Sequence, residues 1–120
     1  SIPIKKFQEM GYEKNVVVLT QPENYVKKPQ SMMKAIRVKY HKYPNMVRDL
    51  ESRHEKYNDT IAYIKEEVAK NNVFVIQPEA KLDIGRIEHD RKRIRAVYEE
   101  GRKTAMKRLE ELKMFLRQGE

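Results

Sequence analysis

The segment Asn72-Val73-Phe74-Val75-Ile76-Gln77-Pro78 (residues 72–78) decides the fold of this chain. Its four consecutive apolar residues are β-branched or aromatic, which is typical of a central parallel strand buried on both faces. Pro78 lacks a backbone N–H, so the strand has to end before it. The segment Asn15-Val16-Val17-Val18-Leu19-Thr20-Gln21-Pro22 repeats the pattern. The sequence therefore predicts two short buried strands, at about residues 15–20 and 72–76.

Two short helices are predicted around the first strand. Pro3 lies near the first turn of a helix over residues 3–10, and Gly11 is a C-terminal stop signal. Ser31 is a good N-cap for a second helix that runs from residue 32 to about residue 43. That helix carries an apolar side, which comprises Met32, Met33, Ile36 and Tyr40.

Two longer helices complete the pattern. Pro44 opens one that runs to about residue 70, and Asp90 caps another that runs to about residue 117. Both have apolar residues at helical spacing, so each is expected to bury one stripe. The stripe of the first comprises Val47, Leu50, His54, Tyr57, Ile61, Ile64 and Val68. The stripe of the second comprises Ile94, Val97, Tyr98, Gly101, Ala105, Leu109, Leu112 and Leu116.

The element order α-β-α-α-β-α predicts a helix-rich α/β fold with parallel strands. Two strands alone make an incomplete sheet, since parallel sheets normally have several strands and are covered on both faces. Leu82-Asp83-Ile84 is the only other strand candidate, and it is weak. We therefore expect the sheet to be completed by a second copy of the chain or by residues outside it.

Composition sets the broad class. The 120 residues suffice for one domain, with 39% apolar and 37% charged residues, as in a small soluble protein. There is no Cys, which excludes disulfide frameworks and Cys-based zinc sites. No apolar run approaches a membrane span or a signal peptide. The net charge of +8 favours an acidic partner.

No catalytic motif is present. The chain has neither a Gly-x-Ser-x-Gly elbow nor a Gly-rich phosphate loop, and we expect no catalytic residue, metal or other cofactor. Asp83, Glu88 and Asp90 cluster before the last helix, where capping by Asp90 is favoured over acid–base or cation chemistry. His54 is expected to be a hydrogen-bonded boundary histidine and not a ligand.

Basic residues gather in two places. One cluster surrounds the start of the last helix, and Arg91, Arg95 and Arg102 share a face there. The other comprises Lys34, Arg37, Lys39 and Lys42. Interleaved glutamates and the lack of an aromatic RNA-binding motif disfavour nucleic acid, so an anionic lipid surface is the favoured partner.

Several segments together resemble the C-terminal part of bacterial patatin-like phospholipases, which are serine lipid acyl hydrolases. They cover nearly the whole chain, and their order and spacing carry the resemblance. The segments are Ser1-Ile2-Pro3-Ile4, Gly11-Tyr12, Val16-Val17-Val18-Leu19-Thr20-Gln21-Pro22, Tyr25-Val26-Lys27-Lys28-Pro29, Tyr43-Pro44, Arg53-His54, Tyr57-Asn58, Val73-Phe74-Val75-Ile76-Gln77-Pro78, Gly85-Arg86-Ile87-Glu88, Tyr98-Glu99-Glu100-Gly101 and the leucine-rich tail at 109–116.

The resemblance implies a parent enzyme with a Ser-Asp dyad that lies outside this chain. Residues 1–28 would be the last helix and strand of the catalytic domain, and residues 29–120 a helical C-terminal region with one further strand. No catalytic residue maps onto the chain, so it should be inactive alone. The implied location is the bacterial cytoplasm or the inner face of the membrane.

The expected role is to complete and cover the catalytic fold. Positive charge adds a possible docking function at a lipid surface, carried by Lys27, Lys28, Lys34, Arg37 and Lys39. Two alternatives stay open. One is a stand-alone basic module for an acidic partner such as nucleic acid, and the other is a homo-oligomer that pairs through its strands or through the long helix of residues 44–70.

Overall fold

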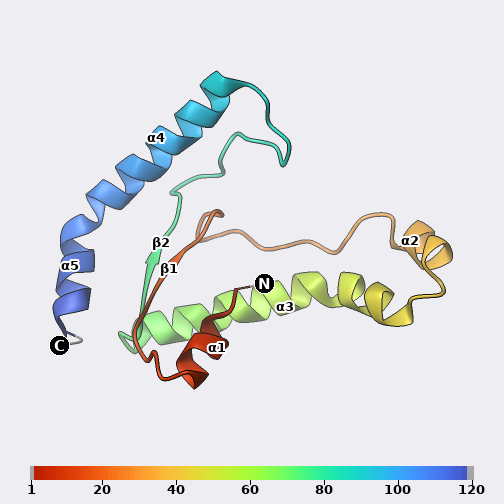
Figure 1. Cartoon of the computed structure of the whole chain (residues 1–120), viewed down its shortest axis with the longest axis horizontal. Helices are drawn as coiled ribbons and strands as arrows, with labels where there is room; N and C mark the ends of the chain where they lie inside the picture. Colours follow the sequence, from red (N-terminus) through yellow and green to blue (C-terminus); the bar gives the residue numbers. More distant parts are fainter. Residues whose placement is uncertain (1, 119–120) are drawn as a thin grey trace.

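The computed structural model describes residues 2–118; Ser1, the first residue of the quoted segment Ser1-Ile2-Pro3-Ile4, and residues 119–120 lie outside the described part. Its helices and strands follow the expected order and confirm a helix-rich α/β fold (Figure 1). They are α1 (Ile4–Glu9), β1 (Asn15–Val18), α2 (Met33–Lys39), α3 (Pro44–Ala69), β2 (Val73–Ile76), α4 (Arg91–Lys107) and α5 (Leu109–Gln118).

The sheet consists of β1 and β2 alone among the described residues, and the two strands are parallel, as predicted. Asn15 pairs with Val73 at one end of the register, and Val18 pairs with Ile76 at the other. Backbone hydrogen bonds flank the ladder, from Asn15 N to Asn72 O at 3.0 Å and from Leu19 N to Ile76 O at 2.8 Å. The sheet is therefore short, parallel and incomplete.

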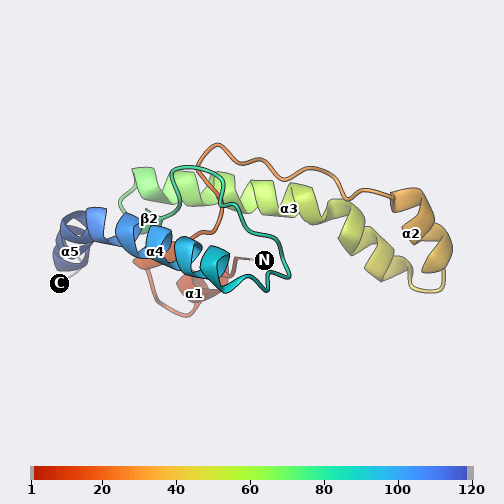
Figure 2. The same ribbon diagram turned by 90° about the horizontal axis from the view of Figure 1, so that it is seen from above.

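Helices lie on both sides of the strands (Figure 2). On one face Val73 and Val75 pack with Ile4 of α1 and Ile64 of α3, and these four residues form the buried core. On the other face Phe74 meets Phe115 of α5, with ring centroids 5.7 Å apart. The arrangement is a three-layer α/β/α unit built around β2.

The molecule is more extended than its length requires. Its radius of gyration is 17.5 Å, whereas a compact domain of this length has about 14 Å. Half of α3 reaches beyond the sheet and carries α2 at its far end (Figure 1). A strap over residues 19–32 returns along α3, where the Asn58 side chain pairs with the backbone N–H and C=O of Lys27 at 2.9 and 3.0 Å.

The second helix differs from its prediction at both ends. Met32, with a left-handed φ of 61°, occupies the N-cap position, and no side chain caps the helix, so the Ser31 cap is wrong. The helix ends at Lys39 and not near Tyr43. Tyr40 already leaves the helical region, with a φ of −110° and a ψ of 28°. Pro44 separately prevents any helix from running through Tyr43, whose ψ is 68°.

The buried stripe of α3 is correct over most of its length and wrong in its last turns. Ile64 is buried as predicted, but Val68 is 44% exposed and Glu67 is buried beside it. The turn after α3 requires this change, because the Glu67 carboxylate accepts a hydrogen bond from Asn72 Nδ2 at 2.8 Å. His54 also differs, since its Nδ1 is buried without a hydrogen-bond partner among the described residues.

The last predicted helix is two helices. Asp90 caps α4 as expected, its side chain accepting from Lys92 N at 2.9 Å, but the helix breaks at Arg108. The break turns α5 so that Phe115 faces the sheet, while Leu116 on the predicted inner face is exposed. Ile94 and Tyr98, also predicted to face inward, are exposed as well.

Two strand predictions also need correction. The first strand ends at Val18 and not at Thr20, and its Val16 and Val18 are exposed, so β1 is not buried on both faces. The cause is coverage: on this face Phe115 of α5 packs against Phe74 of β2, whereas Val16 and Val18 of β1 stay exposed. The 82–84 segment forms no strand in the described part of the chain.

Candidate functional site: one closed and one open sheet edge

The two outer edges of the sheet follow from the ladder geometry. In a parallel strand, successive backbone groups point alternately to the two neighbours. Because Asn15 N and Leu19 N bond to β2, the N–H groups of Val16 and Val18 point to the opposite side of β1. By the same alternation, the carbonyl of Val75 points away from β1 toward the outer side of β2. Each strand thus presents one row of backbone groups to possible partners.

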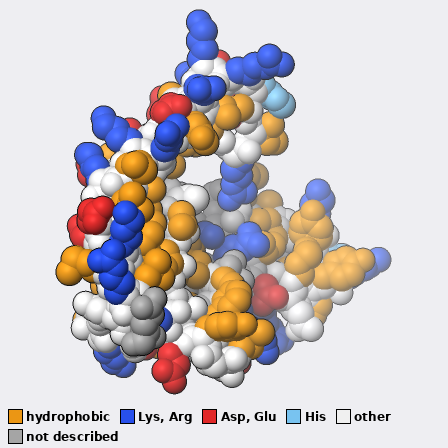
Figure 3. All heavy atoms as spheres, turned by 60° about the vertical axis from the view of Figure 1, so that its left-hand side comes forward, with side chains coloured by type: hydrophobic (Ala, Val, Ile, Leu, Met, Phe, Trp, Pro, Cys, Tyr) orange, Lys and Arg blue, Asp and Glu red, His pale blue; other side chains and the backbone are white. Residues whose placement is uncertain are grey.

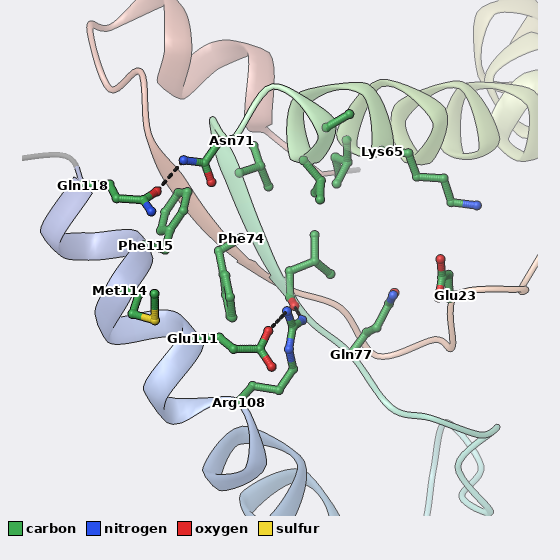
Figure 4. A pocket seen from close by; sticks show the side chains of 15 residues that line it. Glu23, Lys65, Asn71, Phe74, Gln77, Arg108, Glu111, Met114, Phe115 and Gln118 are labelled. Carbon is green, nitrogen blue, oxygen red and sulfur yellow. Dashed lines mark hydrogen bonds and ion pairs between the residues drawn. The ribbon is translucent and has the colours of Figure 1, made fainter.

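A side chain closes the outer edge of β2. The Arg108 guanidinium donates a hydrogen bond to the Val75 carbonyl and lies over the Phe74 ring, 4.2 Å from its centroid. Glu111 Oε2 accepts a further hydrogen bond from Arg108 Nη2 at 3.1 Å. Figure 4 shows Arg108 and Glu111 reaching from the α4–α5 region to this edge. Arg108 therefore occupies the place where a third strand would bond to β2.

An open cavity of about 660 Å³ lies beside this closed edge, between the end of α3 and α5. Phe74, Phe115 and Met114 form apolar parts of its wall (Figure 4). Glu23, Lys65, Arg108 and Glu111 are its charged lining residues. Arg108 and Glu111 pair with each other, and Asn71 pairs with Gln118 at the rim. Ser, Cys and His are absent from the residues that line this cavity.

The outer edge of β1 is open. Val16 and Val18 are 40% and 71% exposed, and they share the face on which Phe74 of β2 is covered by α5. No strand pairs with this edge in the described part of the chain. Exposed β-branched residues beside unpaired backbone groups are the features that recruit a further strand.

The turn between α3 and β2 fixes the position of the sheet. Asn71 adopts a left-handed φ of 61°, which Asn tolerates better than most residues. The hydrogen bond from Asn72 and the nearby Lys70 ammonium, whose Nζ lies 3.8 Å from the carboxylate, lower the pKa of Glu67 against the opposing effect of burial. The buried Glu67 carboxylate therefore holds this turn in its charged form.

The α1 helix holds the start of β1 in place. Ile4 is buried in the core, and the Tyr63 hydroxyl donates a hydrogen bond to Gln8 Oε1. Burial raises the pKa of Tyr63, and the negative charge of Glu67 raises it further. β1 is therefore anchored firmly on its inner side, although its outer edge is free.

The five basic residues proposed for lipid contact are spread along the strap and α2. Arg37 pairs with Glu51 of α3, while Lys27 and Lys39 lie over the rings of Tyr57 and Tyr40, with Nζ 5.4 Å from each centroid. Lys28 and Lys34 are exposed and make no ion pair in the described part of the chain. The structure does not bring the five together into one cluster.

The acidic residues before α4 serve the helix start. Glu88 Oε1 accepts hydrogen bonds from the backbone N–H groups of His89 and Asp90, both at 3.1 Å, and Glu88 also pairs with Arg93. Asp90 is the N-cap. No group of three His or acidic side chains placed to hold a metal occurs within residues 2–118.

Sequence reasoning missed the two side chains that matter most at the sheet, Arg108 and Glu67. Arg108 follows another basic residue and Glu67 follows another acidic residue, a pattern typical of a solvated helix surface. The sequence carries no signal for Arg108, because Ala105 and Leu109 on either side of it keep regular helical spacing. For Glu67 the neighbouring Asn71-Asn72 pair indicates a turn that needs an acceptor.

The chain is thus a small α/β protein with one closed and one open sheet edge. It belongs to the DUF6363 family, a domain of unknown function, whose model matches residues 43–117. This match takes in α3, β2, α4 and nearly all of α5. Neither curated proteins nor solved structures give a match. Within residues 2–118 no helix is both long and apolar enough to cross a bilayer.

Proposed function

We propose that this chain is the C-terminal region of a patatin-like lipid acyl hydrolase and that it completes the catalytic sheet through β1. The observation that supports this most is the open edge of β1, where Val16 and Val18 are exposed although their sequence is typical of a buried strand. In this proposal a strand of the catalytic domain lies beside β1 and covers these residues.

The closed edge of β2 limits where a further strand can join the sheet. A further strand cannot add to β2 without displacing Arg108 from the Val75 carbonyl. Growth on the β1 side meets no such obstacle. β2 would then be the last strand of the whole sheet, with α5 and Arg108 as its permanent cover.

The extended shape agrees with this role. The radius of gyration of 17.5 Å exceeds the value of about 14 Å for a compact domain of this length. Apolar side chains, among them Val16 and Val18, lie exposed on the surface of the chain. Docking of a catalytic domain against β1 would bury that surface and supply the remaining core. The chain would contribute cover and rigidity, while the Ser nucleophile and the Asp that activates it would lie in the docked part.

Contact with a lipid surface is the second part of the proposal. Lys27, Lys28, Lys34, Arg37 and Lys39 would lower the energy of approach to anionic headgroups, because cations near such a surface gain from its negative potential. Of these, Lys28 and Lys34 are the best placed, since the other three already contact Glu51 or a Tyr ring.

The coding sequence upstream of this chain tests the enzyme proposal. We expect the reading frame to continue upstream through an Asp-Gly pair and a Gly-x-Ser-x-Gly motif. A native start codon beside Ser1 would contradict the proposal and favour a stand-alone binding or dimerisation module.

Hydrolysis by the natural full-length protein tests the role of β1. In the variant with Val16→Lys and Val18→Lys, cleavage of a short-chain nitrophenyl ester should fall at least about tenfold, since two buried lysines would separate β1 from its new neighbour. The matched control is Val26→Lys with Val38→Lys, because both of these valines are exposed away from the sheet. Equal activity in the two double variants would contradict sheet completion at β1.

A further inference from the structure

Helix α4 carries an unusual concentration of positive charge. The helix contains seven Lys or Arg residues and two Glu residues, a net charge of +5 over 17 residues. It buries one residue, Thr104, and projects away from the sheet (Figure 1). In Figure 3 basic side chains cluster at the top of the molecule, where α4 begins, with hydrophobic side chains directly beside them.

One face of α4 combines arginines with exposed apolar groups. We define the arginine face by five residues, Arg91, Ile94, Arg95, Tyr98 and Arg102, which follow the i, i+3, i+4, i+7 and i+11 spacing of a single helix face. It lies away from Val97 and Thr104, which face the body of the molecule. Ile94 and Tyr98 are 45% and 59% exposed. Ile87, in the loop before α4, is also exposed and extends the apolar character of this end.

The charges of this face are largely uncompensated. Arg91 and Arg102 have no acidic partner among the described residues, and Arg95 makes a single exposed pair with Glu99 at 3.6 Å. Such an exposed pair contributes little and is easily exchanged for another anion. Arg93 and Lys107, which lie outside the face, pair with Glu88 and Glu79.

We infer that the arginine face of α4 docks on an anionic lipid surface. Arginines at an interface bind phosphate groups, while an adjacent Tyr and Ile insert their apolar bodies at headgroup depth. A nucleic acid would bind the arginines through its phosphates but would make no favourable contact with Ile94 or Ile87. The arginine face also has a single aromatic ring, whereas proteins that bind single strands stack bases on several. This inference rests on the charge and exposure of α4 and stands whether or not the chain belongs to a hydrolase.

The test is co-sedimentation of the chain with vesicles of phosphatidylcholine containing 30% phosphatidylglycerol. The variant carries Arg91→Gln, Arg95→Gln and Arg102→Gln. We expect its partition coefficient to fall about 100-fold, since each cation near such a surface contributes about fivefold. The matched control, with Lys6→Gln, Arg48→Gln and Arg53→Gln, loses the same charge from exposed positions of α1 and α3 and should fall less than tenfold. Circular dichroism checks that both variants keep their helices.

A single substitution and a competing ligand complete the design. Ile94→Gln leaves the charge unchanged and should lower binding about threefold, whereas a purely electrostatic contact would be unaffected. The inference is overturned if the unmodified chain shows no preference for these vesicles over pure phosphatidylcholine. It is also overturned if the control loses as much as the arginine variant, or if a single-stranded oligonucleotide displaces the chain from the vesicles at equimolar phosphate. None of these results bears on ester hydrolysis, so failure here is distinct from failure of the enzyme proposal.

Discussion

β1 and β2 are both four-residue strands rich in valine, yet they occupy opposite environments. In β2 the residues Val73, Phe74 and Val75 are buried between helices, and Arg108 caps the outer edge. In β1 every second side chain is exposed, and no group of the described chain bonds to its outer edge. An apolar run therefore indicates that a strand is suited to burial, whereas its actual burial depends on which helices and strands pack against it.

The largest effect should come from placing a charge in the covered strand. Val75→Lys puts an ammonium group into the buried apolar cluster that Val75 forms with Ile4, Ile64 and Val73. We expect a loss of about 4 kcal/mol or more in the free energy of unfolding, enough to unfold a domain of this size. Urea titration followed by circular dichroism measures it. A cooperative transition near that of the unmodified chain would show that β2 is not the centre of the core.

Removal of the cap on β2 should have an intermediate effect. Arg108→Ala deletes the hydrogen bond to the Val75 carbonyl and the contact with Phe74, and it should cost about 1.5–3 kcal/mol of stability. Arg108→Lys keeps the charge but not the planar two-armed geometry, and it should recover less than half of the loss. If Arg108→Ala is as stable as the unmodified chain, the outer edge of β2 is not held closed by this residue.

The turn that leads into β2 should give the fold an acid-sensitive element. Because the pKa of Glu67 is lowered in the folded chain, its contribution to stability is complete above the usual value of 4.5 and is lost as pH falls through the lower folded value. Glu67→Gln should remove that part of the pH dependence. Urea midpoints measured between pH 6 and pH 3 test this. Parallel curves for the two proteins would contradict a charged role for Glu67.

The smallest effect is expected at the open strand. Val18→Lys places a long charged side chain where Val18 already meets solvent, so the free energy of unfolding should change by less than about 0.5 kcal/mol. Together with Val75→Lys this forms a matched pair, since the same replacement is made at an exposed valine of β1 and at a buried valine of the neighbouring strand. Destabilisation of similar size at both positions would mean that β1 is covered in solution, for example by a second copy of the chain.

Much of the fold is predictable from local patterns. The two valine-rich runs, their parallel pairing, the long helix after Pro44 and the Asp90 cap follow from period, proline placement and capping chemistry. These features depend on residues close together in sequence, and the structure confirms them. The sheet was correctly predicted to be incomplete because two strands cannot supply their own cover.

The remaining features depend on contacts between distant residues. α4 ends next to Arg108, and the Arg108 side chain reaches a carbonyl 33 residues away, a contact that no helical period encodes. Glu67 can be buried because Asn72 donates a hydrogen bond to its carboxylate across a turn. A pattern of apolar spacing instead predicts that a charged residue is exposed. The exposure of Val16 and Val18 depends on which neighbours stand beside β1, and the sequence of β1 cannot specify them.

Amide hydrogen exchange at residues 16–19 tests whether the outer edge of β1 is open in this chain and paired in the full-length protein. In this chain the N–H groups of Val17 and Leu19 bond to β2, while those of Val16 and Val18 face the open edge. Exchange followed by NMR should therefore be slow at Val17 and Leu19 and fast at Val16 and Val18. In the natural full-length protein all four should be slow, because a strand of the catalytic domain would pair with β1. Fast exchange of Val16 and Val18 in the full-length protein would contradict the account.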